Sequence, residues 1–237
     1  LMSNLTQTTV IGAFCRVRPD LLPASPGSGV SIMNVKTTTK SGQTVMASIG
    51  PVGGGAGGGP KTDGAEGCGA NMSFLKNTPV EINEAEVPIK IHKYGIIPDS
   101  GGAGRYRGGT GLMMEFELFA PQSMVTARNR DRSIISAWGV LGGGPGSVSR
   151  FVKNPDGSNP VELGNSDIVH CDPGDVILIA GPGAGGYGDP LERPVDAVLA
   201  DVERGFVSAE RAKTDYGVVI KADMTVDAKA TAAQRKK

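Results

Sequence analysis

Glycine is concentrated in four stretches of this 237-residue chain, at 50–69, 101–111, 139–146 and 181–188. The chain has 36 glycines, about twice the ordinary usage, and they follow neither a collagen-like period nor a repeat unit. Glycine clusters that alternate with apolar segments favour ordered loops of special geometry between strands over low-complexity disorder. The sequence therefore predicts a strand-rich domain with many structured glycine-rich loops.

The stretch 77–111 contains the clearest strand and the most polar of these loops. Residues 87–97 alternate with the period of a strand, with Val87, Ile89 and Ile91 on one face and Lys90 and His92 on the other. The glycine-rich loop that follows carries Asp99, Ser100, Arg105 and Arg107. A carboxylate, a hydroxyl and two guanidinium groups on a loop that allows close approach are suited to binding a polar ligand. The same residues also fit a structural role, with Asp99 in a turn and the arginines in ion pairs at a subunit interface.

The remaining segments predict an α+β fold with a mostly antiparallel, strand-rich body and one helix at the N-terminus. That helix, residues 3–18, has Val10, Ile11, Phe14 and Val17 on its apolar side. A domain that opens on such a helix is expected to have lost, or never to have had, preceding elements, or else the helix packs on another chain. Two strands are expected in 28–49, a hairpin in 112–129 and further strands in 148–180. Two C-terminal helices are expected at 195–205 and 208–217. Residues 1–220 would form one domain, and 221–237 a charged tail that is either mobile or bound to a partner.

The glycine-rich stretch 50–71 is unusually long for a loop. A phosphate-binding P-loop requires glycine directly before its lysine, whereas Pro60 precedes Lys61 and removes a backbone donor. Two readings stay open: a long surface loop, or a loop that folds over a ligand or a neighbouring subunit, with Asp63 and Glu66 as its polar members.

Charge and composition exclude several classes of partner. The 24 basic and 24 acidic residues give a net charge of zero, which argues against a nucleic-acid-binding protein. No apolar run is long enough to span a membrane. The three cysteines make no CxxC and no secretory signal is visible, so a cytoplasmic protein with reduced thiols is expected.

Several motifs resemble those of the hydantoinase B and 5-oxoprolinase family, in the family's order and spacing, from about Ser25 to Ile220. They include NTPVE at Asn77, PDSGGAGRYRGG at Pro98, WGVLGGGPG at Trp138, GGYGDPLERP at Gly185 and DVERGFVS at Asp201. The resemblance implies a subunit, or part of one, of an ATP-dependent cyclic-amide hydrolase, in which a hydantoinase A-like subunit binds ATP and Mg and phosphorylates the small-molecule substrate. The chain resembles only the C-terminal half of a B subunit. The N-terminal half, where a divalent metal would sit, is therefore expected as a separate chain or as the rest of a longer one, and this chain is not expected to be active alone.

The resemblance also suggests roles for individual residues. Asp99 would orient a water molecule or pair with Arg105 or Arg107, and Glu81 would act as a base if burial raised its pKa. The substrate-binding candidates are Ser100, Arg105, Arg107, Asp63 and Asn77. Two alternatives remain open, namely a subunit of an ATP-dependent ketone carboxylase, which the same resemblance includes, and a non-catalytic assembly module.

Overall fold

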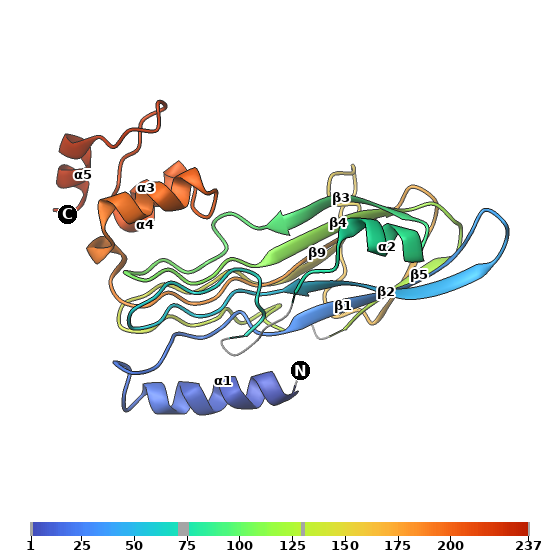
Figure 1. Cartoon of the computed structure of the whole chain (residues 1–237), viewed down its shortest axis with the longest axis horizontal. Coiled ribbons are helices and arrows are strands. Elements are labelled where there is room, and N and C mark those ends of the chain that lie inside the picture. Colours follow the sequence, from blue (N-terminus) through green and yellow to red (C-terminus); the bar gives the residue numbers. More distant parts are fainter. Residues whose placement is uncertain (1, 71–75, 129–130, 237) are drawn as a thin grey trace.

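The computed structural model describes residues 2–70, 76–128 and 131–236. Within these ranges the chain forms two β-sheets, a bundle of glycine-rich segments, and helices at both ends (Figure 1). The elements in order are α1 Met2–Cys15, β1 Val30–Thr38, β2 Thr44–Gly53, α2 Val80–Glu86, β3 Ile89–Ile96, β4 Leu112–Leu118, β5 Ser123–Arg128, β6 Arg150–Lys153, β7 Val161–Glu162, β8 Ile168–Cys171, β9 Val176–Ala180, the 3₁₀ helix η1 Pro190–Glu192, α3 Val195–Glu203, α4 Ala209–Tyr216 and α5 Ala228–Gln234. The expected α+β class is confirmed.

The two sheets share one hydrophobic core. Their strand orders are β2-β1-β5-β8 and β3-β4-β9-β6-β7, and every strand pair that the structure describes is antiparallel. Met33 and Val35 of the first sheet and Met114, Phe116 and Ile177 of the second are fully buried in this core. Burial of each such side chain contributes roughly 1.5–3 kcal/mol relative to exposure, so the alternating apolar pattern holds the two sheets together.

The strand expected at 87–97 is confirmed as β3. Val87 and Ile89 are buried, Ile91 is half-buried, and the side chains of Lys90 and His92 are on the exposed face. The polar residues of β3 pair with those of β4: His92 Nε2 lies 3.0 Å from a carboxylate oxygen of Glu117. The period-2 pattern therefore identified both faces of this strand correctly.

The hairpin expected in 112–129 is wrong. β4 pairs with β3 and β9 in one sheet, and β5 pairs with β1 and β8 in the other. The connection between them crosses from one sheet to the next through Gln122, which has a positive φ of 57°. Both strands bury alternate residues in the shared core, and a hairpin would show the same alternation.

Glycine-rich segments form a second part of the molecule, which we call the glycine bundle. In Figure 1 these segments run side by side between the sheets and the C-terminal helices. They hydrogen-bond to one another through backbone groups, for example from Gly27 N to Gly55 O at 2.8 Å and from Gly102 N to Ala184 O at 2.7 Å. The bundle consists of residues 24–29, 53–67, 101–111, 139–147 and 181–188.

Close approach explains the glycines of this bundle. A Cβ atom on Gly55, Gly57 or Gly183 would lie within 3.0 Å of a backbone atom of another segment, and none of the three has a positive φ. Glycine is needed here as it is at the axis of collagen, because only hydrogen fits between the chains. Residues 53–59 are buried inside the bundle. Neither reading of the 50–71 stretch, as a surface loop or as a loop covering a ligand, anticipated this.

The C-terminal helices are capped as the sequence predicts. α3 begins after Pro194, and α4 begins after Ser208, whose hydroxyl accepts a hydrogen bond from Arg211 N, and ends at Gly217 in the left-handed conformation. The segment expected as a tail contains an additional helix, α5. Its Arg235 donates to Tyr216 O at 3.0 Å and to Arg193 O at 2.7 Å. α2 and α5 were not expected from the sequence.

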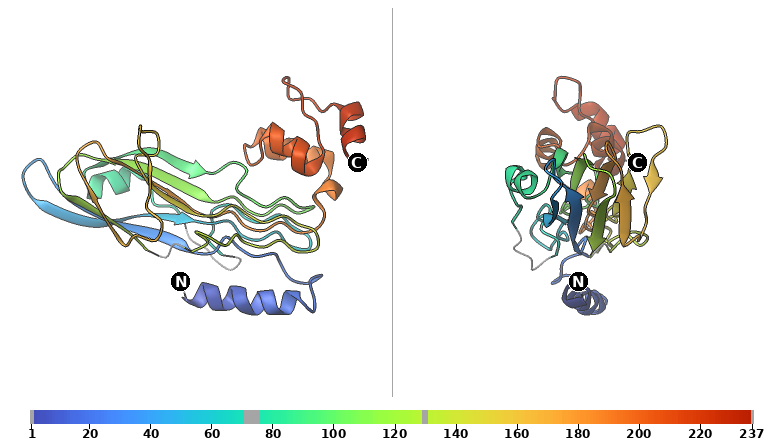
Figure 2. Two further views of the ribbon diagram at one scale, coloured as in Figure 1. Left: turned by 180° about the vertical axis from the view of Figure 1, so that it is seen from behind. Right: turned by 90° about the vertical axis from the view of Figure 1, so that its right-hand side faces the viewer.

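α1 runs along one side of the glycine bundle (Figures 1 and 2). It occupies most of the helix expected at 3–18. Among the described residues, no helix is both long and apolar enough to cross a membrane.

Candidate functional site

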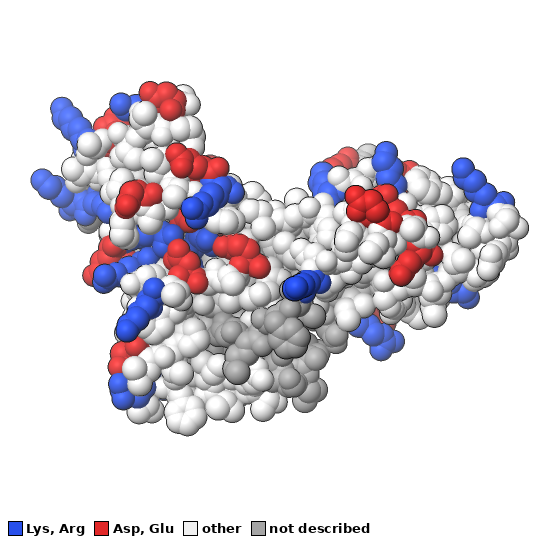
Figure 3. All heavy atoms as spheres, viewed as in Figure 1, with Lys and Arg blue, Asp and Glu red and all other residues white. Residues whose placement is uncertain are grey.

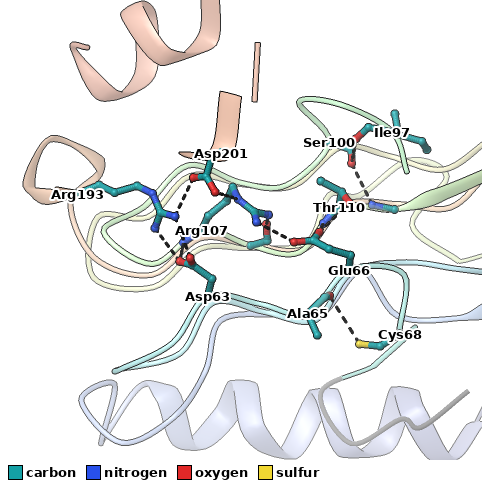
Figure 4. Close-up of polar contacts among 12 residues, drawn as sticks. Asp63, Ala65, Glu66, Cys68, Ile97, Ser100, Arg107, Thr110, Arg193 and Asp201 are labelled. Atoms are coloured by element: carbon teal, nitrogen blue, oxygen red, sulfur yellow. Dashed lines mark hydrogen bonds and ion pairs between the residues drawn. The ribbon is translucent and has the colours of Figure 1, made fainter. Parts of the chain in front are cut away.

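Five charged residues meet where the glycine bundle joins the C-terminal helices (Figure 4), and three of them, Arg107, Arg193 and Asp201, are buried. Arg193 makes a two-point ion pair with Asp63, with Nη1 and Nη2 at 2.7 and 2.8 Å from its two oxygens. Arg107 Nη2 lies 2.7 Å from Glu66 Oε1. Asp201 lies between the two guanidinium groups, 2.7 Å from Arg193 Nη2 and 3.5 Å from Arg107 Nε. We call Asp63, Glu66, Arg107, Arg193 and Asp201 the arginine–carboxylate cluster.

Four separate segments position these side chains. Asp63 and Glu66 follow β2, Arg107 lies on the loop 101–111, and Arg193 directly follows η1. Asp201 lies on α3, so the cluster ties this helix to the bundle. The Arg107 guanidinium also lies 4.6 Å from the centre of the Phe206 ring, which follows α3.

The cluster also holds backbone groups. Asp63 accepts a hydrogen bond from Arg107 N at 2.7 Å, and Arg193 donates to Arg105 O at 3.0 Å. Glu66 accepts from the Thr110 hydroxyl at 2.7 Å as well as from the Thr110 amide. The carboxylates and Arg193 therefore fix the backbone of residues 105–110 at three points.

Burial and neighbouring charge act in opposite directions on these groups. Burial acts to raise the pKa of Asp63, but hydrogen bonds from Arg193 and its charge outweigh this effect and hold the pKa below its usual value. Burial raises the pKa of Asp201 despite the charges of Arg107 and Arg193. Burial also acts to lower the pKa of Arg193, but Asp63 and Asp201 raise it overall. Asp63 is thus firmly ionised, and Asp201 is the carboxyl group that burial favours in its neutral form.

The structure brings together only some of the residues expected at a site. Asp63 and Arg107 belong to the cluster, and 2% of Arg107 is exposed. Its guanidinium is already occupied by Glu66 and by Gly108 O at 2.8 Å. Arg105 is exposed, and its Nη1 lies 3.4 Å from Glu192, which is also exposed. Of these two arginines, Arg105 is the one whose guanidinium can reach a ligand.

Asp99 and Ser100 are held by backbone groups of the fold. The Asp99 carboxylate accepts a hydrogen bond from Ser208 N at 2.7 Å, at the start of α4. The buried Ser100 hydroxyl donates to Ile97 O at 2.7 Å and accepts from Gly111 N at 3.0 Å. Both residues thus have structural partners.

Glu81 and Asn77 lie apart from the cluster in the chain and in the fold. Asn77 is exposed in the coil before α2, and Glu81 is exposed in the first turn of that helix. α2 packs on β2 and β3. The burial that a base role would require is not present at Glu81.

Sequence reasoning did not identify Arg193 and Asp201 as site candidates. Both lie in quoted motifs, Arg193 in GGYGDPLERP and Asp201 in DVERGFVS. The signal that could have identified them was their opposite charges, which lie on either side of the start of α3. Within residues 2–70, 76–128 and 131–236, no group of three or more His, Cys, Asp or Glu side chains is arranged to hold a metal ion.

Comparison with known proteins gives the family. The model of the hydantoinase B/oxoprolinase family matches residues 1–190. The chain belongs to this family. The match includes α1, which precedes the region of motif resemblance in the sequence.

Individual known proteins match over almost the whole chain. The caprolactamase beta subunit of Pseudomonas jessenii is 34% identical over 226 residues, which cover 92% of this chain and 39% of that subunit. The crystal structure of the ATP-dependent caprolactamase from the same organism superposes with a TM-score of 0.79 at 30% identity, covering 95% of this chain and 40% of that one. The nucleotide-free structure of acetone carboxylase superposes with a TM-score of 0.74 at 22% identity, covering 94% and 34%. This last likeness concerns the fold alone. The chain thus spans about two fifths of the length of the caprolactamase subunit.

Proposed function

We propose that this chain is part of the B subunit of an ATP-dependent hydrolase of cyclic amides. The supporting observation is its 34% identity to the caprolactamase beta subunit across 92% of its length. The related solved structure is named as an ATP-dependent caprolactamase. A lactam or hydantoin ring is the substrate class that the relatives suggest.

Further components complete the proposed enzyme. A hydantoinase A-like subunit would bind ATP and Mg, and the N-terminal half of the B subunit, with a divalent metal if one is used, would be supplied outside this chain. The N-terminal half of the B subunit is proposed because this chain spans only 39% of the caprolactamase subunit. Such an enzyme would need this chain for activity, and this chain would be inactive alone.

Arg105 is the residue that we propose for contact with the reacting substrate. An amide activated by ATP passes through an anionic, phosphorylated species, which cationic donors stabilise. The Arg105 side chain is 53% exposed, and the arginine–carboxylate cluster fixes its backbone through Arg193. Asp63 and Arg107 would act as positioning residues. Ser100, Asn77, Asp99 and Glu81 remain proposals as further site residues.

The test measures turnover by the whole complex, reconstituted with its A subunit and the remaining part of the B subunit. ATP hydrolysis coupled to ring opening of caprolactam, hydantoin or 5-oxoproline is the expected result. Turnover of acetone only with bicarbonate would instead identify a ketone carboxylase, an alternative that here has the support of fold similarity only.

The Arg105→Ala variant separates a site from an assembly module. We expect the complex to assemble as the wild type does and to lose at least about tenfold in kcat/KM. Loss of assembly together with activity would favour a non-catalytic interface role for this loop.

A further inference from the structure

Helix α1 carries no charge. Its sequence, MSNLTQTTVIGAFC, contains no charged residue in 14 positions. A helix at a protein surface normally carries charged and polar residues on the side away from the core. Among the described side chains of α1, the exposed polar residues are the uncharged Thr6, Gln7 and Thr9. α1 lies along the outside of the glycine bundle (Figure 2), so an uncharged and partly apolar helix is at the surface of this chain.

One side of α1 packs on the chain itself. Thr8 is 5% exposed, and a Cβ atom on Gly12 would lie 2.8 Å from the ring of Trp138. The Cys15 thiol donates to Pro23 O at 3.6 Å. The opposite side faces outward, because Val10 is 49% and Phe14 61% exposed.

Further exposed apolar side chains flank the cavities beside α1. Ile134 and Ile135 are 84% and 71% exposed, and Leu141 is 54% exposed. Two cavities, of about 380 and 660 Å³, lie against α1, and Trp138 lines both. In Figure 3 the lower edge of the molecule, where α1 lies in Figure 1, is white between the charged residues at its left end and the grey residues. We call Val10, Phe14, Ile134, Ile135 and Leu141 the α1 face.

We propose that the α1 face is the surface on which the rest of the hydantoinase B-type subunit docks. This inference rests on the proposed function, in which that polypeptide completes the subunit. More than half of the caprolactamase subunit lies outside its match with this chain, so a large body of protein is available to cover one face. The α1 face is suited to this contact because its members are apolar, α1 itself carries no charge, and two cavities beside α1 could receive partner side chains. Arg16, Asp131 and Arg132 are among the residues that line these cavities.

The experiment measures binding between this chain and the polypeptide that completes the subunit, expressed as a separate chain. The double variant Val10→Asp/Phe14→Asp places two charges on the α1 face. The control variant Met46→Asp changes another exposed apolar residue, 71% exposed, on β2. We expect the double variant to bind at least about tenfold more weakly and the control to bind like the wild type. Melting temperatures of the isolated chains should be unchanged, because all three side chains are exposed.

A photo-crosslinking residue at position 14 identifies what covers the face. The expected product joins position 14 to the completing polypeptide. Wild-type binding by the double variant would overturn the proposal. A crosslink to a second copy of this chain, with a dimer in light scattering that the double variant abolishes, would overturn it too.

Measuring both assembly and ring opening by the reconstituted complex distinguishes a failure of this inference from a failure of the proposed function. Ring opening by a complex that contains the double variant at wild-type occupancy would refute the docking surface and leave the function intact. A complex that assembles through α1 but opens no cyclic amide would support the docking surface and refute the proposed function.

Discussion

Asp63 and Arg193 are 130 residues apart in the sequence, yet their carboxylate and guanidinium groups meet in parallel at 2.7 and 2.8 Å. This pair joins the segment after β2 to the residue that precedes α3 by two positions. Because Arg193 also contacts Asp201 and Arg105 O, one guanidinium links the glycine bundle, the loop 101–111 and the C-terminal helices. The cluster therefore holds the predicted ligand loop in place.

Replacing Asp63 by Asn should destabilise the chain. Arg193 is 3% exposed, and its charge would lose its best partner. Because the Asp63 side chain is itself 37% exposed, we expect a loss of about 2–3 kcal/mol, below the 3–5 kcal/mol of a fully buried pair. Urea unfolding measures this change. Asp20→Asn is the matched control, since its pair with Arg18 is exposed and should contribute far less to stability. Equal effects of the two variants would contradict the account.

Asp99 tests how α4 is attached to the loop. It has a positive φ of 61° and accepts from Ser208 N. Asn tolerates this backbone conformation and can accept the same bond, so Asp99→Asn should keep wild-type stability, whereas Asp99→Ala should lose about 1–2 kcal/mol. Chemical denaturation of both variants decides the matter. A loss of complex activity in Asp99→Asn at unchanged stability is the result that a water-orienting role requires.

Gly183→Ala should disrupt the glycine bundle. Its new Cβ would overlap the backbone carbonyl of Ser100, which cannot move without shifting a neighbouring segment. We expect a loss of more than about 3 kcal/mol or failure to fold, as for overpacked sites of the most severe kind. Gly95→Ala is the control, because nothing lies within 4 Å of its Cβ position. The melting temperatures of the two variants should differ widely, and similar values would show that the bundle tolerates side chains.

Tyr94 should make stability depend on alkaline pH. Burial raises its pKa from 10.0 to about 12, and its hydroxyl donates to Pro51 O at 2.7 Å. Between these two values the unfolded chain binds fewer protons than the folded chain, so stability is fully present below about pH 10 and falls as pH rises toward 12. Tyr94→Phe removes this dependence but loses the hydrogen bond, at a cost of about 1 kcal/mol near pH 8.

Unfolding in urea near pH 8 and near pH 11 checks this prediction. The difference in unfolding free energy between wild type and Tyr94→Phe should shrink at the higher pH. The pKa of Cys171, which burial raises to about 11, affects both proteins equally. A difference that grows with pH would have the wrong sign and would refute the assignment.

The sequence predicted those elements whose signals are local. β9 at Val176–Ala180 and the caps of α4 at Ser208 and Gly217 follow from apolar runs and capping residues that lie within a few positions. Strand pairing is different: β4 and β5 join opposite sheets, and the alternation of Phe116 or Val125 is the same whichever sheet holds the strand. Residue patterns therefore predicted where the strands and helices lie but not which strands pair with one another.

The glycine bundle and the arginine–carboxylate cluster depend on contacts between distant segments. Gly183 meets Ser100, and Arg193 meets Asp63, at separations that no local pattern encodes. The motif resemblance identified the family because it depends on several motifs spread along the chain. It assigned no role to Arg193 or Asp201. A role for Arg107 in the site was predicted without the knowledge that its guanidinium is enclosed by Glu66 and Gly108.

The most direct measurement of the central claim is ATP-dependent ring opening of caprolactam by the complete complex, compared with the same complex from which this chain is omitted. The account predicts coupled release of ADP, phosphate and the open amino acid with the chain present, and no ring opening without it. Ring opening that proceeds equally well without the chain, or in the absence of ATP, would contradict the account.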